Sequence, residues 1–87
     1  MDKLPYAELE RMVAEARQEV GLDSRWRHYK GSEYRIADIV ILEATNEVAV
    51  VYTPVDHPTV SFVRSLTVWR ETVEWDGKQV PRFEPVG

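Results

Sequence analysis

The fold is decided by Tyr34-Arg-Ile-Ala-Asp-Ile-Val-Ile-Leu42, a long run of residues suited to extended backbone. Both alternating sets of side chains in this run are largely apolar, apart from Asp38. A strand that is apolar on both faces is typical of the centre of a sheet, and an acid inside it indicates a bulge or a bend. The run therefore predicts a central strand that bends near Asp38.

Further strands are predicted on the C-terminal side of this run. Thr45-Asn46 turns the chain into Val48–Tyr52, which is rich in β-branched residues. The segment 53–58 contains two prolines and is typical of a surface loop. Val60–Arg64 then returns as a strand. The pattern favours an antiparallel sheet of short strands.

The last third of the chain predicts a short helix followed by a hairpin. The stretch 65–72 is helical in this interpretation, with Ser65 as its N-terminal cap, although a continued strand is the alternative. Asp76-Gly77 is a strong two-residue hairpin signal, and Pro81 restricts the final strand to an edge.

The N-terminal segment predicts an amphipathic helix over 5–20. Pro5 suits the first helical position and Gly21 supplies a stop. The apolar side chains recur at helical spacing: Leu9, Met12, Val13, Ala16 and Val20. This apolar stripe can pack on its own domain or on a second copy, so a homodimer through helix 5–20 is one expected partnership.

These elements together predict an α+β protein of one domain, 1–87. The expected architecture is an N-terminal amphipathic helix followed by a small, strongly bent antiparallel β-barrel. The barrel is SH3-like, spans 26–83 and has about five strands with one short helix.

Composition excludes several classes of function. The 87 residues contain no cysteine, so disulfides, thiolate catalysis and cysteine zinc sites are excluded. Histidines are not spaced as metal ligands, and no cofactor or metal is expected. No apolar run follows Asp2 and Lys3, so we expect neither a signal peptide nor a membrane span, and a cytoplasmic location. The net charge of −4 argues against nucleic acid as the main partner.

One segment concentrates groups that can bind a ligand. Arg25-Trp-Arg-His-Tyr-Lys-Gly-Ser-Glu-Tyr34 holds three aromatic residues, three cations, a histidine and a glycine. Four bases lie between Arg25 and Arg35 against Glu33 alone, which is a local cationic patch on an acidic chain. Alternation along a strand should bury about half of these side chains and leave the others to face a ligand.

The residues expected to bind a ligand are His28, Tyr29, Lys30, Tyr34, Tyr52, Arg64, Trp69 and Arg82. Aromatic faces would supply contact area, and Lys30 with Arg64 would neutralise an anion. Structural roles are the alternatives. The histidine and both strand tyrosines can be core residues, and Lys30 can be a solvated lysine at a turn. Arg82 can stack over an aromatic ring, with Phe83 filling the barrel.

Arg64 is the most informative of these candidates. An arginine in an otherwise apolar strand is either paired with an acid, such as Glu47 or Glu71, or directed into a cleft at a carboxylate or phosphate. The adjacent Asp56 and His57 do not form a catalytic pair, because neighbours on a proline loop seldom orient each other. No catalytic residue is assigned.

Several motifs occur in an order and at spacings that resemble a known family. They are Trp26-Arg-His-Tyr-Lys-Gly-Ser-Glu-Tyr34, Val50-Val-Tyr52, Phe62-Val-Arg64, Glu71-Thr-Val73 and Asp76-Gly-Lys-Gln-Val-Pro-Arg-Phe83. The series, from Trp26 to Phe83, resembles the bacterial domain of unknown function 1653, whose activity is unassigned. The resemblance implies a fold and a set of hallmark positions, and no reaction.

The chain departs from that family's pattern in a few places. Relatives tend to have a histidine and a Thr/Ser-Glu pair before the Val-Val-Tyr strand, where this chain has Leu42-Glu43-Ala44-Thr45. Ser65 replaces a usual proline, and Trp69 replaces a phenylalanine. These departures lower the expectation of catalysis.

Three functions are compatible with these patterns. The leading hypothesis is a non-enzymatic binding module that holds a small anionic ligand or a peptide. The second is an enzyme acting on a nucleotide or a modified small molecule, with His28 as acid–base and Arg64 as anion clamp, which requires the two to share one cleft. The third is a weak binder of single-stranded nucleic acid, which has the aromatic platforms but lacks the charge.

Overall fold

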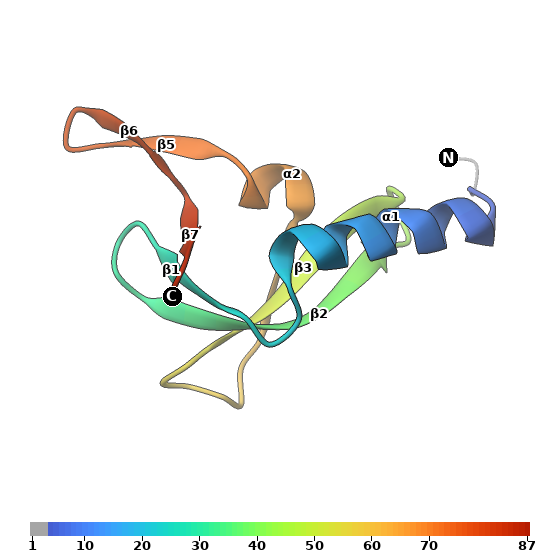
Figure 1. The fold of residues 1–87 in the computed structure, drawn as a ribbon, viewed down its shortest axis with the longest axis horizontal. Coiled ribbons are helices and arrows are strands. Elements are labelled where there is room, and N and C mark those ends of the chain that lie inside the picture. Colours follow the sequence, from blue (N-terminus) through green and yellow to red (C-terminus); the bar gives the residue numbers. More distant parts are fainter. Residues whose placement is uncertain (1–3) are drawn as a thin grey trace.

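The structure is a computed structural model that describes residues 4–87. Its elements are α1 (Tyr6–Val20), β1 (Arg25–His28), β2 (Glu33–Leu42), β3 (Glu47–Pro54), β4 (Phe62–Ser65), α2 (Leu66–Trp69), β5 (Thr72–Trp75), β6 (Lys78–Pro81) and β7 (Phe83–Pro85). An antiparallel five-stranded sheet has the order β4-β3-β2-β1-β7, and β5 with β6 forms a separate hairpin. Helix α1 lies along β2 and β3, while the β5–β6 hairpin extends away from α2 (Figure 1).

The sheet is open, and no closed barrel is found within residues 4–87. Strands β4 and β7 lie at its two edges, and no ladder joins them in this part of the chain. The β5–β6 hairpin pairs only with itself and extends neither edge of the sheet. The α+β class with its N-terminal helix and antiparallel strands is confirmed, and the SH3-like barrel is not.

Strand β2 is central and bent, as its sequence predicts. The register of β2 on β3 shifts between Ile36 and Asp38, which marks a β-bulge. The Asp38 carboxylate accepts a 2.8 Å hydrogen bond from the Ile39 backbone N–H. Residues three apart on a regular strand face opposite sides. The bulge corrects this alternation, so Ile36 and Ile39 are both buried.

The core lies between one face of the sheet and the two helices. Its side chains come from α1, the sheet strands and α2: Ala16, Val20, Ile36, Ile39, Val48, Val50, Tyr52, Leu66, Trp69 and Phe83. Burial in α1 is confined to Ala16 and Val20 near its C-terminal end. The N-terminal half of α1 is therefore less firmly covered than the rest of the molecule.

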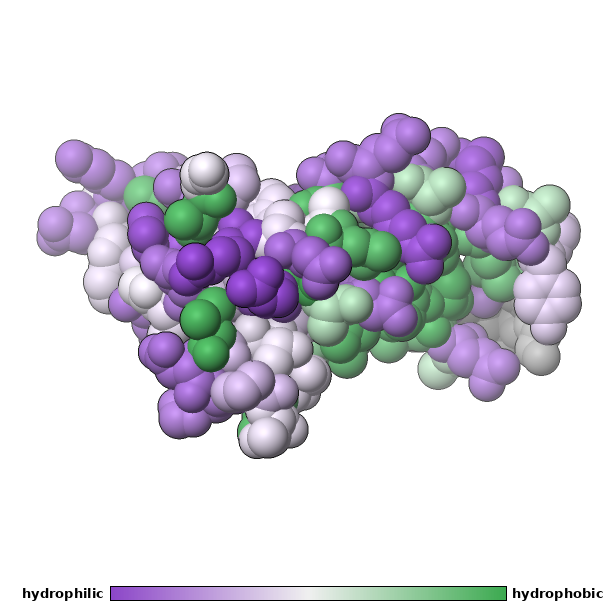
Figure 2. All heavy atoms as spheres, turned by 60° about the horizontal axis from the view of Figure 1, so that its bottom comes forward, coloured by the Kyte–Doolittle hydropathy of each residue, from purple (hydrophilic) through white to green (hydrophobic). Residues whose placement is uncertain are grey.

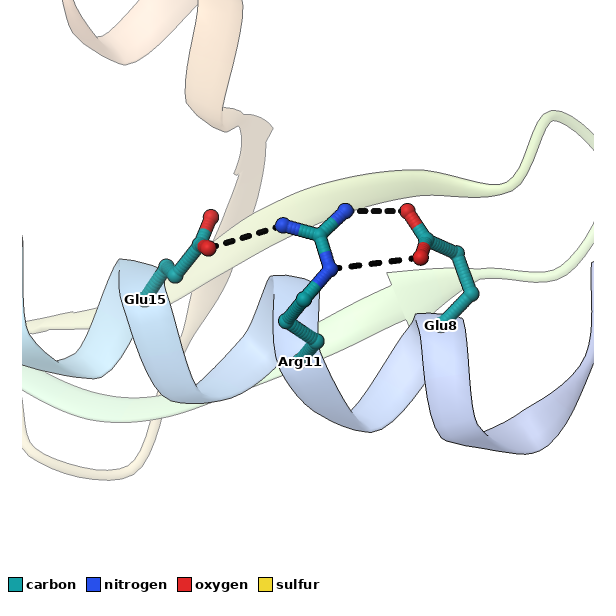
Figure 3. A network of polar contacts seen from close by, with 3 residues as sticks. All are labelled: Glu8, Arg11 and Glu15. Atoms are coloured by element: carbon teal, nitrogen blue, oxygen red, sulfur yellow. Dashed lines mark hydrogen bonds and ion pairs between the residues drawn. The ribbon is translucent and has the colours of Figure 1, made fainter.

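The outer side of α1 carries a polar network. Arg11 lies between Glu8 and Glu15, donating from Nε to Glu8 and from Nη1 to Glu15 Oε1 at 2.7 Å (Figure 3). The hydrogen bond from Arg11 lowers the pKa of Glu8. These groups are fully solvated, so the network adds little stability and marks the face of α1 that points to water.

The hairpin and the second helix begin as the sequence predicts. Asp76 and Gly77 both have positive φ, 55° and 76°, as a two-residue turn of the hairpin type requires. Ser65 caps α2, its Oγ accepting a 3.2 Å hydrogen bond from the Val68 N–H.

Replacing Ser65 with alanine should lower the free energy of unfolding by about 1 kcal/mol, because the first turn of α2 loses its cap. Urea denaturation measures the loss. Thr67, which is exposed in the same helix, is the matched control. An equal loss in Thr67→Ala would show that the hydroxyl of Ser65 has no special role.

Candidate functional site

The ladders of the sheet place most of the predicted site residues on one face. Directly opposed residues of an antiparallel pair share a face. His28 is opposite Phe83, Ile36 is opposite Tyr52, and Val50 is opposite Arg64. Since the core-facing Ile36 and Val50 mark the inner face, His28, Tyr52 and Arg64 all belong to it.

Phe83 is the centre of this face. Its ring stacks on Trp69 with centroids 3.8 Å apart and makes edge contacts with Tyr52 at 5.5 Å and His28 at 5.1 Å. Tyr34 contacts Tyr52 at 5.1 Å. Together with two arginines described below, these residues form what we call the Phe83 cluster: His28, Tyr34, Tyr52, Arg64, Trp69, Arg82 and Phe83.

Arg64 enters the cluster from the edge strand β4. Its Nε donates a 2.8 Å hydrogen bond to the Tyr52 hydroxyl, and its guanidinium lies 5.8 Å from the centre of the Phe83 ring. Neither acid considered from the sequence pairs with it. Glu71 binds Arg82, and Glu47 accepts from the Thr45 hydroxyl. Within residues 4–87 Arg64 has no carboxylate partner.

His28 lies among cations. Its Nδ1 accepts a 3.2 Å hydrogen bond from the Lys30 backbone N–H, so the neutral ring carries its proton on Nε2. Burial lowers the pKa of His28, and the positive charges of Arg64, Arg82 and Lys30 lower it further. The imidazole therefore senses a concentrated positive potential, with three cations within electrostatic reach.

Arg82 is held by an ion pair instead of the expected stacking over an aromatic ring. Its Nη2 lies 3.2 Å from the Glu71 carboxylate, and its backbone bridges Glu71 and Tyr29. No cation–π contact of Arg82 is found in the described part of the chain. Two buried N–H donors in the cluster, Arg82 Nε and Trp69 Nε1, have no hydrogen-bond partner among residues 4–87.

Tyr29 and Lys30 lie beside the cluster, at the turn after β1. The Tyr29 ring contacts His28 at 4.3 Å and Trp75 at 5.3 Å, and the Lys30 ammonium is 5.8 Å from the Tyr29 ring. A cleft of about 160 Å³ opens here, and His28, Tyr29 and Trp75 form part of its wall. Arg64 does not line this cleft. His28 therefore contacts two groups of residues: Tyr29 at the cleft and Phe83 in the cluster.

Alternation divides the Arg25–Tyr34 segment as predicted. Arg25 and Arg27 lie on the opposite face from His28, where both bind Glu33, at 2.7 and 3.0 Å. Their charge is thus neutralised locally. Trp26 packs against Trp69 at 5.5 Å, on the core side.

Sequence reasoning missed three contributors to the site. The sequence predicts Phe83 only as a side chain that fills the barrel. In the structure its ring contacts the aromatic residues of the cluster and lies near the guanidinium of Arg64. Trp75 covers Tyr29, and Glu71 positions Arg82. Nothing near Trp75 in the sequence reveals its role, because the contact depends on how the β5–β6 hairpin returns to the sheet.

His28 should make the stability of the fold depend on pH. A histidine whose pKa is lower in the folded state than its usual value of about 6.5 destabilises the fold when it must bind a proton. The stability is therefore full above about pH 6.5 and falls as the pH decreases toward the folded-state pKa. Urea denaturation of wild type and His28→Gln across this range measures the effect. An equal pH dependence in both proteins would contradict it.

The described residues hold no group of three His, Cys, Asp or Glu side chains placed to bind a metal ion. No helix in residues 4–87 is long and apolar enough to cross a membrane.

The fold and the cluster define a small α+β domain in which one face of an open antiparallel sheet carries aromatic and cationic side chains. A family model described as "Protein of unknown function (DUF1653)" matches residues 24–85, and the chain belongs to this family. A crystal structure of a DUF1653 protein from Bordetella bronchiseptica is similar, with a TM-score of 0.66 and 34% sequence identity over 79% of this chain and 91% of that chain. No curated protein matches. The family resemblance seen in the sequence is confirmed, and the family model begins after α1.

Proposed function

We propose that this protein is a binding module that holds an anionic group, a carboxylate or a phosphate, at the Phe83 cluster. The observation that carries the proposal is the environment of Arg64. Its guanidinium is fixed by the Tyr52 hydroxyl and lies near the Phe83 ring, without a carboxylate partner in residues 4–87. A half-buried cation without a counter-charge is costly, and a bound anion would remove that cost.

The surplus of hydrogen-bond donors in the cluster also supports an anion. His28 Nε2, Arg82 Nε and Trp69 Nε1 are N–H groups, and the last two have no acceptor in the described part of the chain. Among residues 4–87, Glu71 is the only acid that forms an ion pair with an arginine of the cluster. An anion would accept hydrogen bonds from these N–H donors, and its negative charge would balance the positive charge of the arginines.

The anionic group can come from a free small molecule or from a peptide. The edge of the sheet at β4 supports a peptide, because Phe62 and Val63 are 46% and 51% exposed beside Arg64. The opposite edge, β7, is protected by Glu84 and Pro85. An extended peptide paired along β4 would place an acidic group near Arg64. In both cases the positive charge of Arg64 would bind the anionic group.

A catalytic role for His28 is the second candidate, in an enzyme acting on a nucleotide or a modified small molecule. His28 and Arg64 contact the same ring, Phe83, but Arg64 does not line the cleft beside His28, so the shared cleft that this role requires is not met there. The bond from the Lys30 N–H also occupies Nδ1 and leaves a proton on Nε2. In this state the histidine is a hydrogen-bond donor, which favours binding of an anion over general-base catalysis.

Titrations followed by NMR test the proposal and separate the sources of the anion. The probes are inorganic phosphate, a short apolar peptide with a free C-terminal carboxylate, the same peptide as its C-terminal amide, and a single-stranded oligonucleotide. We expect phosphate to shift the Arg64 Nε–H and Trp69 Nε1–H signals. A peptide ligand would shift these and the β4 amides, with weaker binding of the amide form.

Three outcomes would refute the proposal. One is that no probe moves the Arg64 and Trp69 signals. Another is that the free and amidated peptides bind equally, which would show apolar recognition without an anion. Binding of the oligonucleotide alone, through Arg25, Arg27 and Arg35, would also refute it. The binding surface would then be the opposite face of the sheet.

A further inference from the structure

A second concave surface lies far from the Phe83 cluster. A groove of about 880 Å³ runs between α1 and the end of β2 with the turn that follows it. Much of its wall is apolar and includes Tyr6, Leu9, Val13 and Ile41. We call it the helix groove. Figure 2 shows hydrophobic side chains gathered over the half of the molecule that holds α1 and the far ends of β2 and β3.

Helix α1 is buried most deeply at its C-terminal end, and its middle, with Met12 and Val13, packs only partly buried against the core. Ala16 and Val20 are 2% and 4% exposed, whereas Tyr6 is 81% exposed. The sequence continues the apolar stripe of α1 beyond the part that its own domain covers. A partner docked in the groove would bury more of this stripe.

The charges along the groove side of α1 identify that partner. Glu10, Ala14 and Arg17 line the groove at helical spacing. Along the helix they form a stripe of one acidic, one small and one basic residue. Glu10 has no ion-pair partner in residues 4–87, and Arg17 reaches only Asp38, at 3.8 Å, with both side chains about half exposed. The satisfied network of Arg11 with Glu8 and Glu15 lies on another side of the helix (Figure 3).

We infer that the helix groove is the contact surface of a homodimer in which α1 packs antiparallel on α1 of a second copy. An acid–small–base stripe is complementary to itself when the second helix is reversed. A two-fold axis between Val13 and Ala14 places Glu10 opposite Arg17 of the second copy, and generates the same ion pair twice. Ala14 lets the helices approach closely, while Tyr6 and Leu9 become covered.

This surface is independent of the proposed anion site. It is built mainly from α1, which precedes the family-matched region 24–85. The dimer is thus a property of this chain's N-terminal helix, and its test gives no information on the Phe83 cluster.

Sedimentation equilibrium over a range of concentrations tests the dimer with charge-reversed variants. Wild type should reach twice the 10.1 kDa chain mass as its concentration rises. Glu10→Arg alone and Arg17→Glu alone should be monomeric, because each places like charges opposite each other. An equimolar mixture of the two variants should form a heterodimer, and the double variant should dimerise like wild type.

Glu15→Arg is the matched control, because it makes the same charge change on the side of α1 that faces water. It should dimerise like wild type. Circular dichroism verifies that each variant keeps its helix. A wild type that stays monomeric at every concentration would overturn the inference. So would single variants that dimerise as well as wild type, since the dimer would then use another surface.

Discussion

Replacing Phe83 with alanine is expected to lower the free energy of unfolding by about 3–5 kcal/mol. Phe83 is 4% exposed and contacts rings from β1, β3 and α2, so truncation leaves a cavity at the centre of the core. The loss is severe for a chain of this length, whose total stability is about 4–13 kcal/mol at 0.05–0.15 kcal/mol per residue. Urea denaturation followed by tryptophan fluorescence measures it.

Trp75→Ala is the control for loss of an aromatic side chain. Trp75 is 48% exposed and contacts Tyr29 from the hairpin, so its removal should cost far less. Phe83→Leu retains most of the apolar volume and should fall between the two. Equal losses in Phe83→Ala and Trp75→Ala would show that the cluster is not organised around Phe83.

Replacing Arg64 with alanine is expected to weaken anion binding by about 10- to 100-fold while the protein stays folded. This range corresponds to a charged hydrogen bond of about 1.5–3 kcal/mol. Because Arg64 has no carboxylate partner in residues 4–87, its removal leaves no acid unpaired. The unliganded protein should stay folded but lose about 1–3 kcal/mol of stability, because the buried Tyr52 hydroxyl loses its donor. Calorimetric titration and urea denaturation measure the two quantities on the same samples.

Two further variants separate charge from geometry. Arg64→Lys keeps the charge but loses the fixed donor to the Tyr52 hydroxyl, and Tyr52→Phe removes the acceptor that orients the guanidinium. Both should bind the anion with intermediate affinity. Arg70→Ala, which removes an exposed arginine bound to Glu19, should bind like wild type. Unfolding of both Arg64→Ala and Tyr52→Phe would mean that the cluster is purely structural.

Local signals in the sequence predicted local structure well. The apolar spacing of α1, the Asp76-Gly77 turn, the Ser65 cap and the bulge near Asp38 each depend on a few neighbouring residues. Alternation also predicts that about half of the Arg25–Tyr34 side chains are buried, and the registers of β1 on β2 and β7 place His28 on the inner face and Arg25 and Arg27 on the other.

Features that depend on distant pairing were not predictable in the same way. The predicted barrel does not close, because β4 and β7 do not pair with each other in residues 4–87, and no local pattern in the sequence reports on pairing between strands so far apart. The partner of Arg64 was likewise open between an acid and a ligand. In the structure Glu71 pairs with Arg82, and Arg64 donates to the Tyr52 hydroxyl, contacts that depend on how distant strands are placed. The central place of Phe83 depends on the register of β7 on β1.

The pKa of His28 with and without a bound anion tests the central claim most directly. Sulfate is the suitable probe because its charge does not change across the titration of histidine, and a His57→Gln background leaves His28 as the sole histidine. Burial lowers the pKa of His28, and Arg64, Arg82 and Lys30 lower it further, so the negative charge of an anion bound among these cations should raise it. We predict that saturating sulfate raises the pKa of His28 in wild type and leaves it nearly unchanged in Arg64→Ala. A pKa that does not move while sulfate binds elsewhere would contradict the account.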